Sequence, residues 1–130
     1  MSVNVGLIPE AVEDLERYAA SGNIRRFLAK LVRLEDVGED AGVPLGRSLV
    51  GFRKIVVGDR DWRIIFRMNE AKTAATVWVI GDRADEACYA EAVARLQKRG
   101  EDPAAQTLAA VMLELMESKR KRKKKGGVGA

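Results

Sequence analysis

The fold is decided by LVGFRKIVVGDRDWRIIFRM, residues 49–68, and by ATVWVI, residues 75–80. Three segments, 49–57, 62–68 and 75–80, are rich in β-branched and aromatic residues, which favour strands. Gly58-Asp59-Arg60 separates the first two segments with residues typical of a tight hairpin turn. The sequence therefore predicts three consecutive strands of an antiparallel sheet.

Upstream of these strands, the chain has one short apolar run and two segments of helical periodicity. Residues 3–8 predict a strand, and Pro9 suits the first turn of a helix. Apolar residues recur at helical spacing in 9–20 and in 24–34, and the short break between them predicts a helical hairpin. Residues 38–46 are typical of a loop. This order predicts an α+β domain with helices stacked on one face of the sheet.

The last third of the chain predicts further helices. Residues 85–99 have one apolar side, and Asp102 with Pro103 predicts the start of another helix. That helix would carry an apolar stripe from Leu108 to Met116. We expect the stripe to pack on the domain, on a second copy of the chain or on a partner protein. The expected division is a domain at 1–100, a helical extension at 101–118 and a basic, disordered tail at 119–130.

Composition excludes several classes of protein. A hydrophobic fraction of 47% and a charged fraction of 32% are typical of a soluble globular domain. No apolar run reaches the roughly 18–20 residues that span a membrane, and no signal peptide is visible. The single cysteine, Cys88, allows no intrachain disulfide, so we expect a cytoplasmic protein.

The net charge of +4 is unevenly distributed. Lys119–Lys125 is an uninterrupted run of seven cations, so the remainder of the chain is slightly acidic. We therefore expect any surface that binds a polyanion to lie in the second half of the chain and in the tail.

The usual catalytic groups are absent. The chain has no histidine, hence no imidazole base and no Ser-His-Asp triad. One cysteine cannot build a zinc site, and we expect neither a metal nor a cofactor. Lysine, arginine and tyrosine remain. Cleavage of RNA by its own 2′-hydroxyl needs a base, cations around the phosphorane and an acid for the leaving oxygen. Tyrosine or lysine can be the base where guanidinium groups lower its pKa, and arginine binds phosphate.

Strand alternation permits such groups to gather. The Trp62 side of its strand is expected to face the core, which leaves Arg63 on an open face, where Lys54 of the preceding strand would converge with it. Arg83 follows the third strand, and Tyr89 comes six residues later in a helix. A simpler interpretation exists for each: an arginine on a strand is often only solvated, and a helical tyrosine often only packs.

This arrangement resembles the RelE/ParE superfamily of bacterial toxins. The resemblance covers roughly residues 3–96 and rests on LVGFRKI at 49–55, the Gly-Asp turn, the aromatic before Arg63, Gly-x-Arg at 81–83 and the tyrosine at 89. It implies a RelE-like fold, with an N-terminal strand and helical hairpin packed on an antiparallel sheet. It also implies a toxin of a type II toxin–antitoxin system that cleaves messenger RNA on the ribosome without metal.

The resemblance assigns roles to four residues. Tyr89 would be the base, Lys54 would assist it, and Arg63 and Arg83 would hold the phosphate. Arg83 would also help the leaving group. Further contacts to RNA are expected from six other cations, which are Arg53, Arg60, Arg67, Lys119, Arg120 and Lys121.

Two alternatives stay open. A ParE-like toxin binds and poisons DNA gyrase without a catalytic cluster, and a degenerate member only binds its antitoxin. RelE-type enzymes often carry a second lysine two residues after the first, where this chain has Val56. All of these interpretations imply a cognate antitoxin that covers the sheet with a helix or an extended segment. The RelE interpretation adds the ribosome and messenger RNA as partners, and the basic run is either an anchor for ribosomal RNA or a solvated tail.

Overall fold

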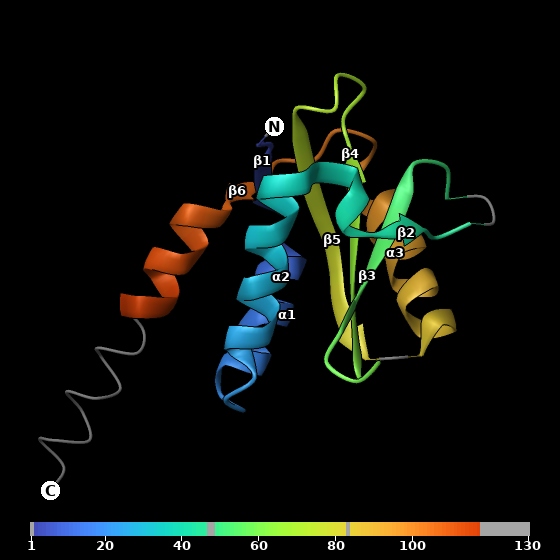
Figure 1. Ribbon diagram of the computed structural model, residues 1–130. Coiled ribbons are helices and arrows are strands. Elements are labelled where there is room, and N and C mark those ends of the chain that lie inside the picture. Colours follow the sequence, from blue (N-terminus) through green and yellow to red (C-terminus); the bar gives the residue numbers. More distant parts are fainter. Residues whose placement is uncertain (1, 47–48, 83, 118–130) are drawn as a thin grey trace, which may run out of the picture.

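The strands rich in β-branched residues form the middle of a six-stranded sheet with the order β2-β3-β4-β5-β1-β6 (Figure 1). The structure is a computed structural model that describes residues 2–46, 49–82 and 84–117. β3 (Phe52–Val57), β4 (Trp62–Met68) and β5 (Ala74–Asp82) are antiparallel neighbours. β1 (Asn4–Leu7) lies beside β5 and runs parallel to it. The predicted α+β class and the three consecutive strands are confirmed.

Two short border strands were not expected from the sequence. β2 (Val43–Pro44) pairs with β3 inside the segment predicted to be a loop, just after a 3-10 helix, η1 (Gly38–Ala41). β6 (Gln106–Thr107) pairs with β1.

The prediction that a helix begins at Asp102 and Pro103 is wrong. The helix covers residues 108–117 instead, because the chain first adds β6 to the free edge of β1. Gly6 of β1 permits this approach, since a Cβ atom there would lie 3.1 Å from the Cβ of Ala105. The hydroxyl of Thr107 accepts the N–H of Ala110 at 3.2 Å and caps the helix.

Helices cover both faces of the sheet (Figure 1). α1 (Pro9–Ala19) and α2 (Ile24–Val37) lie on one side, and α3 (Asp85–Arg99) packs on β5 and β4 from the other. The helical hairpin thus stacks on one face of the sheet, as expected, and α3 adds cover on the other face. Residues 64–66 of β4 are consecutive and fully buried, which requires cover on both faces because strand side chains alternate.

Aromatic side chains form one cluster on each face of the sheet. Under α1 and α2, the ring of Trp62 lies 5.4 Å from that of Phe27, measured between centroids. On the α3 side, Phe52 and Trp78 meet edge to face at 5.6 Å. Trp62 thus faces the core beneath α1 and α2, as expected.

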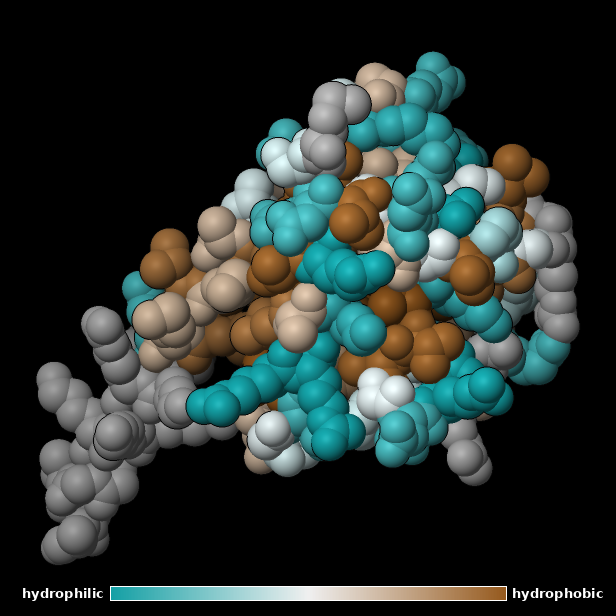
Figure 2. Space-filling model, in the orientation of Figure 1, coloured by the Kyte–Doolittle hydropathy of each residue, from teal (hydrophilic) through white to brown (hydrophobic). Residues whose placement is uncertain are grey.

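The helix at 108–117 packs most of its apolar stripe on the domain. Leu108 and Val111 are buried, and Met112 and Leu115 pack against the core, whereas Met116 is 55% exposed. Leu113, which lies off the stripe, is 61% exposed. Figure 2 shows hydrophobic residues gathered over this helix, at the left of the molecule. Among the described residues, no helix is both long enough and apolar enough to cross a membrane.

Candidate functional site

The predicted site lies on the sheet face that α3 covers in part, which we call the α3 face. Val56 pairs with Arg63 and Lys54 pairs with Ile65 in the β3–β4 ladder. Opposite residues of an antiparallel pair point to the same side, so Lys54 and Arg63 share the α3 face as diagonal neighbours. Such neighbours are roughly 7 Å apart, within reach of long side chains. The two cations therefore share one face, and their action as a pair stays a prediction.

Arg63 is not on an open face, which corrects the expectation from strand alternation. Only 8% of the residue is exposed. Its Nη1 atom donates to the backbone oxygens of Arg60, at 3.1 Å, and Trp62, at 3.0 Å. These bonds hold the guanidinium beside the β3–β4 turn. A guanidinium fixed in this way loses little further conformational entropy when it meets a phosphate.

Tyr89 reaches the α3 face from the first turns of α3. Gly81 pairs with Arg63, and a Cβ atom at Gly81 would lie 3.4 Å from Sγ of Cys88. The buried Cys88 thiol donates to the backbone oxygen of Asp82 at 3.1 Å. The start of α3 thus lies close to the end of β5, and half-buried Tyr89 follows Cys88 and packs against the core. Arg83 lies outside the described residues.

The other predicted RNA contacts are distributed over both faces and the turn. Arg53 donates to the backbone oxygens of Glu39 and Gly42, both at 2.9 Å, and so supports the η1 segment on the α1–α2 side. Arg67 is on the α3 face, where it pairs with Glu101 and lies over the ring of Phe52. Arg60 is exposed in the β3–β4 turn. Lys119, Arg120 and Lys121 lie outside the described residues.

A buried ion pair that sequence reasoning missed fixes α3 in place. β1 ends opposite Val77, so among the described strands none lies beside the edge of β5 beyond that residue. Asp14 of α1 accepts the N–H of Ile80 at 3.0 Å. Arg95 of α3 donates to the backbone oxygen of Trp78 at 2.8 Å and to the Asp14 carboxylate at 2.6 Å. The two side chains therefore satisfy the open edge of β5 and join α1 to α3.

A second link between the same helices strengthens this connection. Glu10 accepts from Arg99 at 2.6 Å and lies 3.3 Å from Nζ of Lys98. Burial alone would raise the pKa of Glu10, but the hydrogen bond from Arg99, a backbone hydrogen bond and Lys98 outweigh it and lower the pKa to about 2. Helical spacing could have pointed to the ion pair of Asp14 with Arg95, because Asp14 falls on the apolar stripe of α1 between Ala11 and Leu15.

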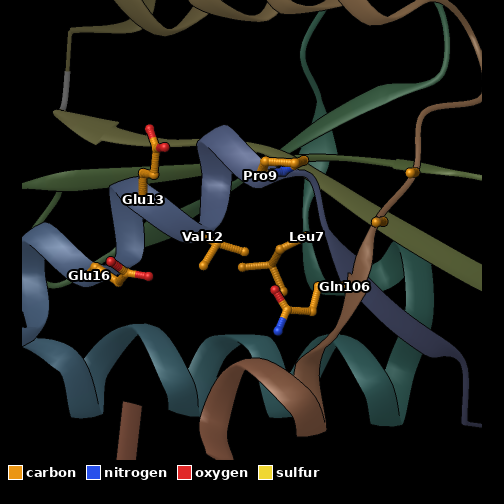
Figure 3. Close-up of a pocket in the computed structure, with 8 residues that line it drawn as sticks. Leu7, Pro9, Val12, Glu13, Glu16 and Gln106 are labelled. Atoms are coloured by element: carbon orange, nitrogen blue, oxygen red, sulfur yellow. The ribbon is translucent and has the colours of Figure 1, made fainter. Parts of the chain in front are cut away.

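A hollow of about 460 Å³ lies beside the end of β1 and the start of α1. No predicted site residue lines it. Figure 3 shows it between α1, the end of β1 and Gln106, with Leu7, Pro9 and Val12 along its wall. Glu13 and Glu16 also line it. Two carboxylates at an apolar hollow disfavour a nucleic acid, so the hollow is not part of the candidate site.

Comparisons with known proteins bear on the fold. No protein-family model matches the chain, and no curated protein matches it. Among solved structures, the chain is similar to an arginine-substituted variant of the Escherichia coli toxin RelE in the free state, with a TM-score of 0.60 and 21% identity. The match covers 74% of this chain and 99% of RelE. The toxin–antitoxin complex RelBE2 of Mycobacterium tuberculosis matches at a TM-score of 0.49 and 22% identity, over 63% of this chain and 99% of that one.

The chain therefore has the fold of RelE-like toxins. The solved structure that carries this conclusion is that of Escherichia coli RelE. The match spans RelE almost completely but leaves about a quarter of this chain unmatched.

Proposed function

We propose that this protein is the toxin of a type II toxin–antitoxin pair and cleaves messenger RNA on the ribosome. The observation that supports the proposal best is the placement of Lys54 and Arg63 as diagonal neighbours on the α3 face of a RelE fold. Tyr89 comes to the same side on α3, which is anchored by Arg95. These residue types suit RNA cleavage without a metal.

The chemistry requires only proton transfer and charge stabilisation. Tyr89, assisted by Lys54, takes the proton of a 2′-hydroxyl, whose oxygen then attacks the adjacent phosphorus. Arg63 and Arg83 stabilise the negative charge of the phosphorane. The bond to the 5′-oxygen breaks, and that oxygen takes a proton as it leaves. The products are a 2′,3′-cyclic phosphate and a 5′-hydroxyl end.

The test is primer extension on a defined message in a purified translation system. Wild-type protein is expected to cut in the ribosomal A site, and only when ribosomes are present. Tyr89→Phe, which removes one hydroxyl, is expected to slow cleavage by roughly 10²–10⁴-fold, the usual contribution of a general base.

The chain offers a matched control in its other tyrosine. Tyr18 packs on Phe27 and Trp62 under α1 and α2, on the far side of the sheet. Tyr18→Phe should leave the cutting pattern and rate unchanged. Equal activity of wild type and Tyr89→Phe would remove the tyrosine from the mechanism.

The ParE-like alternative predicts a different result from the same protein. It would inhibit DNA supercoiling by purified gyrase and leave messages intact. A degenerate family member would do neither and would only bind its antitoxin.

We also propose a cognate antitoxin that neutralises the protein by covering the α3 face. Burial of Lys54 and Tyr89 under a helix or an extended segment would block access of RNA. The product of a small adjacent gene is expected to co-purify with the toxin and to abolish cleavage. A protein that is harmless when it is expressed alone would contradict this pairing.

A further inference from the structure

Cations without a partner gather on one part of the molecule. Of the lysine and arginine residues that the structure describes, most donate to a carboxylate, to a backbone oxygen or to another group. Five make no such contact within the described ranges 2–46, 49–82 and 84–117. They are Arg25, Arg26, Lys30, Arg33 and Arg60.

Four of these five cations belong to α2, and the fifth, Arg60, lies in the β3–β4 turn. Arg25, Arg26 and Arg33 are exposed, and Lys30 is half-buried. A hollow of about 430 Å³ joins the helix to the turn and is lined by Arg26, Lys30 and Asp59 among others. Figure 2 shows hydrophilic residues gathered over the N-terminal half of α2, low in the centre of the view.

The four cations on α2 form a surface of their own, which we call the α2 surface. α2 packs on the sheet face opposite the α3 face. The α2 surface is therefore separated from Lys54, Arg63 and Tyr89 by the sheet, and it cannot be part of the candidate cleavage site.

The spacing of the α2 surface matches a row of phosphates. Arg25 and Arg33 are eight residues apart, which is about 12 Å along a helix. One strand of a duplex carries a phosphate about every 3.4 Å of axis, so this length meets three or four of them. Three of these four cations are arginines, whose planar guanidinium groups bind phosphate oxygens in pairs. Leaving unpaired charges side by side is costly for folding, and an external anion would relieve that repulsion.

We propose that the α2 surface binds the phosphate backbone of a nucleic-acid duplex, separately from the cleavage site. That this duplex is structured RNA and not DNA rests on the proposed function. The binding of a duplex by the α2 surface does not rest on it. An RNA duplex held by α2 would leave the α3 face free for a single-stranded message, so that one molecule contacts two RNA segments at once.

The experiment measures binding of full-length protein to a fluorescent RNA duplex and to a DNA duplex of the same sequence, over a series of salt concentrations. The test variant is Arg25→Gln/Arg26→Gln/Arg33→Gln. The control variant removes three exposed cations that do have partners, Arg17→Gln/Lys72→Gln/Lys98→Gln. Those side chains are 68%, 59% and 70% exposed and pair with Asp14, Glu39 and Glu10.

Both triple variants have the same net charge and the same basic tail, so only the location of the lost charges differs. The α2 variant should lower the slope of log affinity against log salt by about 3, and the control by less than about 1. Asp59→Asn removes the carboxylate that lines the hollow with Arg26 and Lys30, and is expected to strengthen binding about twofold.

The outcomes separate the two proposals. Weakened duplex binding by the α2 variant supports the α2 surface, and a preference for RNA or for DNA identifies the duplex. Equal binding by the two triple variants overturns it. Binding of a poly-glutamate peptide with equal strength and the same dependence on the three arginines also overturns it, because the surface would then fit an acidic protein. If Tyr89→Phe loses cleavage but binds the duplex as strongly as wild type, the α2 surface acts independently of the cleavage site.

Discussion

Asp14→Asn is the most informative single change for the stability of the fold. The carboxylate is 1% exposed and accepts from the backbone of Ile80 and from the guanidinium of Arg95. Asparagine keeps the shape and one acceptor oxygen, so the bond from Ile80 can survive. The change removes the negative charge that faces Arg95, whose side chain is only 12% exposed.

The expected cost follows from the contacts that remain. Loss of one partner of a buried ion pair typically costs about 3–5 kcal/mol. Arg95 keeps its bonds to Glu91 and to the oxygen of Trp78, which places this site below that range, at about 2–3 kcal/mol. Burial alone would lower the pKa of Arg95, but the hydrogen bond and charge of Asp14 outweigh it and raise the pKa above its ordinary value. Arginine stays charged in proteins, so Asp14→Asn leaves this guanidinium without the Asp14 charge that faces it.

Urea unfolding followed by tryptophan fluorescence measures this cost, because Trp62 and Trp78 lie on the two faces of the sheet. Glu13→Gln is the matched control, since Glu13 is an exposed carboxylate on the same helix; it should change stability by less than about 0.5 kcal/mol. A double-mutant cycle with Arg95→Gln should give a coupling energy of at least about 1 kcal/mol. An Asp14→Asn protein as stable as wild type would refute the role assigned to the pair.

Three further changes test other parts of the fold. Glu10→Gln should cost about 1 kcal/mol at neutral pH; because the pKa of Glu10 is lowered from 4.5 to about 2, the difference from wild type should be complete above about pH 5 and vanish as pH falls toward 2, which urea titrations across this range will check. Gly42→Ala would place a Cβ atom 2.6 Å from the backbone oxygen of Lys54 and 2.7 Å from the ring of Phe66, so the unfolding free energy should fall by about 2 kcal/mol, and an unchanged urea midpoint would contradict this close approach. Thr107→Ala removes the hydroxyl that caps the helix at 108–117 and should lower the unfolding free energy by about 1 kcal/mol. Amide hydrogen exchange in that helix should become faster, and unchanged exchange rates would argue against the cap.

Local sequence patterns predicted the elements that depend on local physics. The boundaries of β4 at Trp62–Met68 and of α3 at Asp85–Arg99 agree with the expected ones, because strand alternation and helical periodicity are strong there. β2 and β6 could not be predicted, since two residues carry no periodicity and pair only because a free strand edge is nearby.

The candidate site was predicted in part for the same reason. The common face of Lys54 and Arg63 follows from period-two alternation within two adjacent strands. The burial of Arg63 does not, because it depends on how the chain folds back around the β3–β4 turn and under α3. The partners of Arg53 and Arg95 are likewise contacts between distant segments, and no pattern within one segment reveals them.

The parallel pairing of β1 with β5 has a consequence for how the chain acquires its structure during synthesis. Asn4 is aligned with Ala74, and Asp14 pairs with Arg95, so β1 and α1 find these neighbours only after β5 and α3 have been made. Contacts this distant in sequence form slowly. At roughly 5–20 residues per second, the N-terminal strand remains unpaired for several seconds of translation. An incomplete chain therefore cannot assemble the α3 face, and any activity that depends on it begins only when nearly the whole domain has been made.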